Sequence, residues 1–363
     1  MTSTATTATG LDTGTSRPAT LAGGDLVEIA SRLVAAAVVS ITFAFTVNFF
    51  LSFGWGWPGL PALFADAGWF GFAPLRNPLD DAQVLRGWIQ VAIYVVPILF
   101  AIVWIASTLH RPLQRGADAY SELAAFIIRA SFWSVFLVGF VDAVISFLRV
   151  EDFLPLLVGD DMTIKLGLSK FRGQYVHLPL MALSCIIALF TRSLSVVWLA
   201  LLIVLAEIQI VFTRFIFSYE QAFMGDLVRF WYASCFLLAS AYSLVDEGHV
   251  RVDVFYARFS EKRKAWTNAV GSMALGVPLC WVILTMGMWT KGSSLASPLL
   301  NFEISQSGFG MYVKYLMAGL LVIFALSMAA QFTAYFLESV AVLRRKDTGG
   351  DAAPASAAAP SHP

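Results

Sequence analysis

Residues 196–217 read VVWLALLIVLAEIQIVFTRFIF, and this stretch is long and apolar enough to cross a bilayer as one helix. A bilayer core of about 30 Å needs about 20 consecutive apolar residues in helical conformation. Across the 363 residues, 58% are hydrophobic and 13% are charged, and the mean hydropathy is +0.73. This balance is typical of an integral membrane protein and excludes an ordinary soluble domain.

Comparable stretches recur along the whole chain. The fold class is therefore expected to be all-α, a polytopic bundle of about eight transmembrane helices. The expected spans are residues 33–54, 87–108, 124–148, 175–190, 196–218, 228–245, 266–289 and 312–337. Only residues 191–193 separate the fourth span from the fifth, so a single bent or re-entrant element is the alternative there.

The distribution of Lys and Arg predicts the orientation. Eight spans with both termini in the cytoplasm place most basic loop and tail residues on the cytoplasmic side, as the positive-inside rule requires. Arg149, Lys165, Lys170 and Arg172 then fall in outer loops, among acidic residues. Residues 1–26 are rich in Ser, Thr, Ala and Gly and are expected to form a disordered tail.

Several classes of function find no support in the sequence. The 24 basic and 24 acidic residues cancel, so no nucleic-acid partner is indicated. The three cysteines lie inside apolar stretches and the four histidines are scattered, so we expect no disulfide, metal site or cofactor. Phosphate-loop, nucleophile-elbow and zinc-protease motifs are absent, which argues against an enzyme.

Ionisable residues inside spans are costly and are candidates for function. Arg129 and Asp142 share the third span but lie about 20 Å apart along a helix, too far to pair. The simplest interpretation is that Arg129 extends to the cytoplasmic face while Asp142 bonds a neighbouring helix. Glu207, in the middle of the fifth span, is either bonded within this chain, protonated, or in contact with a partner protein.

Two further groups of charged residues are candidate sites. One is an ionic cluster where the fifth and sixth spans meet, with a solvated surface as the alternative. The members of this cluster would be Arg214, Glu220, Asp226 and Arg229. The loop after the sixth span alternates valines and phenylalanines with charged residues, as in a segment lying in the cytoplasmic membrane interface. Its charged members are His249, Arg251, Asp253, Lys262, Arg263 and Lys264, and a merely solvated basic loop is the alternative.

Residues from about 196 to 340 resemble the small membrane subunit of tripartite ATP-independent periplasmic (TRAP) transporters, the DctQ-type small permease. Residues 211–217, VFTRFIF, look like the family's Val-x-x-Arg-Tyr-x-Phe, and HVRVD at 249–253 is similar to its His-[Ile/Val]-x-Val-Asp. Glu303 and Ser305, on the outer side, precede the last span as acidic or polar residues often do in this family. The Trp and Glu common at the start of the family's second helix are missing here.

The resemblance divides the chain into parts. It implies a DctQ-like four-helix domain at residues 191–346, preceded by a four-span extension of open role at 27–190 and followed by a disordered tail at 347–363. It also implies a scaffold subunit in a bacterial inner membrane. Its partners would be a large membrane subunit that carries the sodium and substrate sites, and an extracytoplasmic binding protein that delivers an organic anion, typically a carboxylate.

Two other functions fit the same composition. In the first, the chain is a self-sufficient transporter or channel whose pathway between the two halves is lined by Glu207, Asp142 and Arg129. In the second, it is a membrane anchor or assembly protein with no part in transport.

Overall fold

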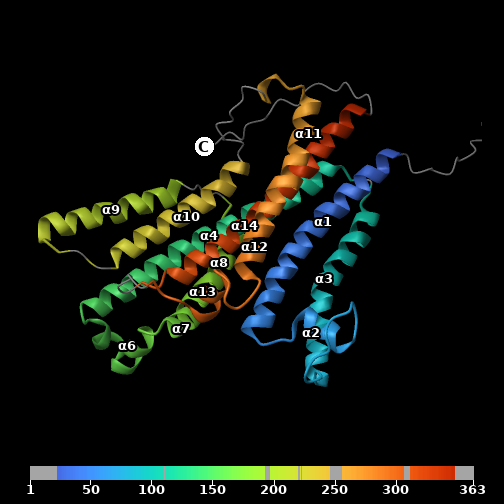
Figure 1. Ribbon diagram of the computed structural model, residues 1–363. Helices are drawn as coiled ribbons and strands as arrows, with labels where there is room; N and C mark the ends of the chain where they lie inside the picture. Colours follow the sequence, from blue (N-terminus) through green and yellow to red (C-terminus); the bar gives the residue numbers. More distant parts are fainter. Residues whose placement is uncertain are drawn as a thin grey trace, which may run out of the picture.

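The computed structural model describes residues 23–109, 111–192, 197–219, 221, 223–245, 256–305 and 311–347. Within them the regular elements are all helices (Figure 1), which confirms the expected fold class. The long helices are α1 (Gly23–Phe49), α3 (Asp81–Ser107), α4 (Leu113–Val150), α8 (Leu178–Phe190), α9 (Val197–Phe217), α10 (Met224–Val245), α11 (Glu261–Gly271), α12 (Val277–Met288) and α14 (Lys314–Asp347). The short ones are α2 (Gly59–Asp66), α5 (Leu154–Val158), α6 (Asp160–Leu166), α7 (Ser169–Arg172) and α13 (Ala296–Asn301). Apart from residues 23–26 and 347, the two expected tails lie outside the described residues.

Seven stretches of the described residues are long and apolar enough to cross a membrane. They are Leu26–Gly54, Asp81–Ser107, Leu113–Val150, Ser169–Phe190, Val197–Phe217, Glu261–Met288 and Lys314–Arg344. The remaining expected span, 228–245, lies within α10, a 22-residue helix that is not among the seven. Helix α8 ends at Phe190, because the backbone of Thr191 is extended, and α9 packs on α10. Spans four and five are therefore separate helices.

Two of the spans contain a π-turn at the same position relative to a proline. Gly173–His177 joins α7 to α8, Ser272–Gly276 joins α11 to α12, and Pro179 and Pro278 each follow two residues later. A proline in a helix lacks its N–H and its ring clashes with the carbonyl four residues earlier. The wider π-turn relieves this conflict and keeps each helix continuous. The fourth span therefore begins at Ser169, earlier than the sequence predicts.

Helix α14 forms the centre of the bundle. It packs against α1, α4, α10, α11 and α12. Of the residues in its most apolar 18-residue stretch, 61% are buried, against 11% in the corresponding stretches of α3 and α9. One hydrophobic core joins the two halves of the chain, because Phe132 of α4, Phe230 of α10 and Met328 of α14 all belong to it. The boundary near residue 190 therefore does not separate two cores.

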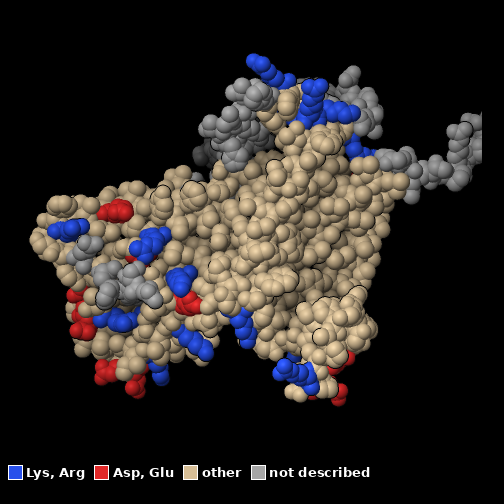
Figure 2. Space-filling view, in the orientation of Figure 1, with Lys and Arg blue, Asp and Glu red and all other residues tan. Residues whose placement is uncertain are grey.

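Both described ends of the chain lie at the same end of the bundle. Helix α1 begins there and α14 ends there (Figure 1), and Glu28 pairs with Arg344 at 2.5 Å. Figure 2 shows Lys and Arg atoms gathered at this end over α11, beside a broad uncharged surface. The common end agrees with the expectation of both termini on one side of the membrane, which the positive-inside rule predicts to be the cytoplasm.

Candidate functional site

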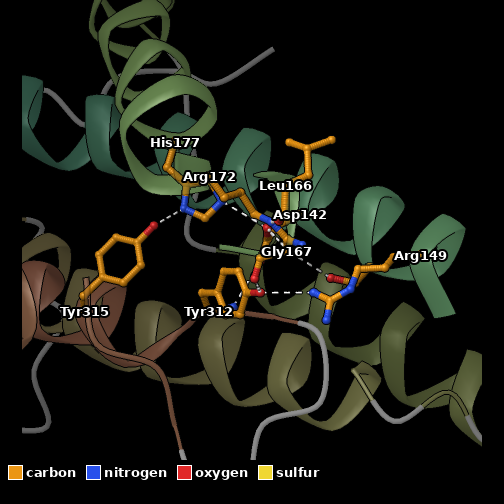
Figure 3. A network of polar contacts seen from close by, with 9 residues as sticks. Asp142, Arg149, Leu166, Gly167, Arg172, His177, Tyr312 and Tyr315 are labelled. Atoms are coloured by element: carbon orange, nitrogen blue, oxygen red, sulfur yellow. Dashed lines mark hydrogen bonds and ion pairs between the residues drawn. The ribbon is translucent and has the colours of Figure 1, made fainter. Parts of the chain in front are cut away.

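A buried ion pair between Asp142 and Arg172 lies at the centre of a polar network (Figure 3). Asp142 lies on α4 and Arg172 ends α7; Nη1 of the arginine is 2.8 Å from Oδ1 of the aspartate, and both side chains are 0% exposed. The arginine also donates from Nε to the Leu166 carbonyl at 2.9 Å and from Nη1 to Ser146 Oγ at 3.3 Å. A guanidinium in the low-dielectric interior needs such a counter-charge and several acceptors to be stable.

Tyr312, in the segment that leads into α14, holds the ion pair from the other half of the chain. Its backbone N–H donates to Oδ2 of Asp142 at 3.3 Å, and its ring centre lies 4.4 Å from the guanidinium carbon of Arg172. Its hydroxyl donates to the Gly167 carbonyl and accepts from Nη1 of Arg149 at 3.1 Å. A single residue therefore contacts the carboxylate, the guanidinium and the loop between α6 and α7.

His177 extends the network through the π-turn of the fourth span. Its Nε2 lies 3.0 Å from Oδ1 of Asp142, and its Nδ1 contacts the hydroxyl of Tyr315 at the start of α14. Gly173 opens the same π-turn, and a Cβ there would lie 2.2 Å from the ring of Phe302. The glycine therefore permits the close approach that brings His177 to the segment before α14.

The network joins the two halves of the chain at one buried point. Residues 142–177 supply the carboxylate, the guanidinium and the imidazole, while residues 312 and 315 supply the tyrosines. Asp142 accepts from Arg172, His177 and Tyr312, so its oxygens are already bonded within the protein. Among the described contacts, neither Glu207 nor Arg129 touches this network.

Of the expected ionic cluster, the structure describes the pair between Asp226 and Arg229. Asp226, at the start of α10, is buried and lies 3.2 Å from Nη1 of the half-exposed Arg229. Arg214 is exposed near the end of α9, and Glu220 lies outside the described residues.

The basic loop is described only from Tyr256 onward, so His249, Arg251 and Asp253 lie outside the described residues. Lys262, Arg263 and Lys264 form the first turn of α11, which begins a candidate span. They therefore lie at the start of a candidate membrane helix. Ser260 caps this helix, and Lys264 Nζ lies 5.3 Å from the ring centre of Tyr256.

Glu303 fixes the connection from α13 to α14. Its Oε2 lies 2.6 Å from Nζ of Lys314, and Ser297 donates to its Oε1. These hydrogen bonds, from Lys314 first and then from Ser297, lower the pKa of Glu303 below its ordinary value. Ser305 follows two residues later and is partly buried.

Glu207 lies on a mostly apolar surface of the molecule. It is exposed in the middle of α9, and its carboxylate forms no hydrogen bond or ion pair with any described residue. Its neighbours Val204 and Ile208 are 52% and 47% exposed, and Phe215 near the helix end is 80% exposed. Glu207 is ten residues from either end of α9, about 15 Å, so in a membrane it sits near the depth where an uncovered carboxylate is most costly.

Together these features define a multi-pass helical membrane protein. Residues 200–341 match the family model described as tripartite ATP-independent periplasmic transporters, DctQ component. This part of the chain is therefore similar to the TRAP transporter small permease, and four of the seven candidate spans among the described residues lie before the match. The family is a transporter component and not an enzyme family, and its members generally work with a large subunit and a binding protein. The search of curated proteins and the search of solved structures each returned no match.

The residues at the centre of the network were only partly visible in the sequence. Asp142 stands out as a carboxylate inside a span, but Arg172 falls in an expected outer loop and is instead fully buried. His177 gives no signal beyond its place at the start of a span, and neither tyrosine differs from an interfacial aromatic. The one available signal was the unpaired charge of Asp142, which requires a basic partner from another element.

Proposed function

We propose that this chain is the small subunit of a TRAP transporter that takes up an organic anion, a carboxylate, in a sodium-driven process at a bacterial cytoplasmic membrane. A separate large subunit carries the substrate and sodium sites, and an extracytoplasmic binding protein delivers the anion. The observation that carries the proposal is the match of residues 200–341 to the DctQ family. In this arrangement the chain is a fixed scaffold and transports nothing alone.

The packing of the molecule supports the role of a rigid scaffold. A helix that moves during transport is expected to have few fixed contacts with the rest of the bundle. Here α14 is the most buried candidate span, and Tyr312, just before α14, bonds Asp142 and so ties this helix to the N-terminal half. We infer that residues 27–190 are an integral part of this scaffold and do not move as a separate module.

Helix α9 is the surface that we assign to the large subunit. It is the first helix of the family match and packs mainly on α10, which leaves a long apolar face with Glu207 in its middle. A partner with a polar group opposite Glu207 would remove the cost of a carboxylate facing lipid. Helix α3 is equally exposed but lies outside the family match and carries no charge between Gly87 and Ser107.

Site-specific photo-crosslinking in native membranes tests this assignment. A photoreactive amino acid replaces Ile208 on α9 or, as a matched control, Val103 on the exposed face of α3. The proposal predicts that position 208 crosslinks to a large multi-span protein, identified by mass spectrometry, whereas position 103 does not. Crosslinks to that protein from position 103 and none from position 208 would assign the interface to α3. Absence of crosslinks from both positions would contradict the proposed partner.

A further inference from the structure

A cavity of about 520 Å³ lies where the DctQ domain meets the N-terminal half, at the end of the bundle that holds both described chain ends. Helices α1, α3, α4 and α14 form its wall. Arg32 of α1, Arg111 between α3 and α4, and Arg115 of α4 line it, and none of its lining residues, all of them described, is acidic. Its lining residues include none from the Asp142 network or from α9.

The arginines leave the cavity with an excess of positive charge. Arg32 is 9% exposed; it donates to Oε1 of Glu28 at 2.6 Å and to the carbonyl of Arg111. Its buried Nε has no acceptor among the described residues. Glu28 is also the partner of Arg344, so one carboxylate serves two guanidiniums.

The other two arginines have no acidic partner among the described residues. Arg111 lies over the ring of Trp104 at 5.8 Å, and Arg115 is exposed. An anion held between these guanidiniums would receive charge-assisted hydrogen bonds, which are the strongest that side chains offer to a phosphate.

The rest of the cavity is mostly apolar and runs along the membrane-facing side of α3. Pro97, Phe100, Ala101, Trp104 and Thr108 line it, and the eleven helical steps from the first to the last span about 16 Å. Phe100 is 66% exposed and Trp104 is 52% exposed, so this side faces the bilayer. A small soluble anion would fill only the arginine end, whereas a molecule with a charged head and a hydrocarbon chain fits both parts.

We propose that this cavity is a binding site for an anionic phospholipid, with its phosphate between Arg111, Arg115 and Arg32 and one acyl chain along α3. Basic pockets between membrane helices on the cytoplasmic side are suited to such headgroups. The lipid would fill the space between α1, α3 and α4 and so connect the N-terminal helices. All lining residues but Leu337 belong to the N-terminal region, and the site is independent of the role proposed for the DctQ domain.

Native mass spectrometry of the purified full chain tests the proposal. The protein is mixed in mild detergent with phosphatidylglycerol, or with phosphatidylcholine of the same chains, and the retained lipid is counted. We expect retention of phosphatidylglycerol and loss of phosphatidylcholine. Replacing two arginines, in R111Q/R115Q, should weaken retention by about tenfold to thirtyfold, since each basic group contributes about one factor of five.

The control is R86Q, which removes an exposed arginine at the opposite end of α3 and should leave retention unchanged. Thermal unfolding without added lipid shows whether R111Q/R115Q is folded; if it is not, each single variant is measured instead. Equal retention of both lipids, or equal retention by R111Q/R115Q and wild type, would overturn the proposal. An excess of inorganic phosphate that displaced phosphatidylglycerol completely would instead assign the site to a soluble anion and overturn the lipid assignment.

Discussion

Replacing Asp142 by Asn should destabilise this protein more than any loss of a surface charge. The substitution keeps the size of the side chain but removes the counter-charge of Arg172, which is fully buried 2.8 Å away. Loss of one partner from a buried pair costs about 3–5 kcal/mol, because the other charge remains in a low-dielectric interior. His177 and Tyr312 also donate to this carboxylate and lose a charged acceptor.

The corresponding shift in unfolding temperature follows from the size of the chain. An unfolding entropy of about 2.1 cal/mol/K per residue gives about 0.8 kcal/mol/K for the whole chain. A loss of about 4 kcal/mol therefore lowers Tm by about 5 °C. Thermal unfolding in detergent, followed by tryptophan fluorescence, measures this shift directly.

A double-mutant cycle separates the ion pair from general damage. Replacing Arg172 by Met in the Asp142→Asn background removes the isolated charge. The double variant should therefore lose about 2 kcal/mol less unfolding free energy than the sum of the losses of the two single variants. The control is Glu303→Gln, which breaks the partly exposed pair with Lys314 and should stay near wild type. A D142N protein as stable as wild type, or strictly additive losses, would refute the reasoning.

Three further predictions concern other parts of the molecule. Gly139→Leu should cost about 1–3 kcal/mol, because a Cβ there would lie 2.5 Å from Nε1 of Trp231, and denaturant unfolding would show it. The pKa of Glu303 is lower in the folded state than its unfolded value near 4.5, so the ionised carboxylate stabilises the fold fully above that value. This contribution is lost as pH falls through the folded pKa, and unfolding curves of E303Q should lack the corresponding loss. Glu207→Gln should leave the Tm of the isolated chain unchanged but reduce the amount of large subunit that co-purifies; an equal yield would exclude Glu207 from the interface.

The spans were predictable because each is a local pattern. Continuous apolar stretches identify the helices, and the sequence gives no comparable signal for where they extend beyond the membrane. Helix α4 has 38 residues, about 57 Å, where the sequence predicts 124–148, because Leu113 and Ala117 near its start are buried against α14. Pro179 signals a helix start, but the π-turn before it lets the helix begin at Ser169.

The network was not predictable because its members are far apart in the chain. Tyr312 follows Asp142 by 170 residues, and only the packing of α14 against α4 brings them together. Arg172 belongs to a stretch rich in charge, where an exposed position is the ordinary expectation. Its burial depends on the short helices α6 and α7, whose fold no local pattern determines.

The most direct test of the central proposal is to identify what this chain binds in its own membrane. The chain is tagged at the C-terminus in the native organism, purified in mild detergent and analysed by mass spectrometry, with an unrelated multi-span protein carrying the same tag as the control. The TRAP assignment predicts a stoichiometric large multi-span subunit, present with this chain and absent from the control. Recovery of this chain alone across several detergents, together with uptake of an organic acid by vesicles that contain only this chain, would contradict it.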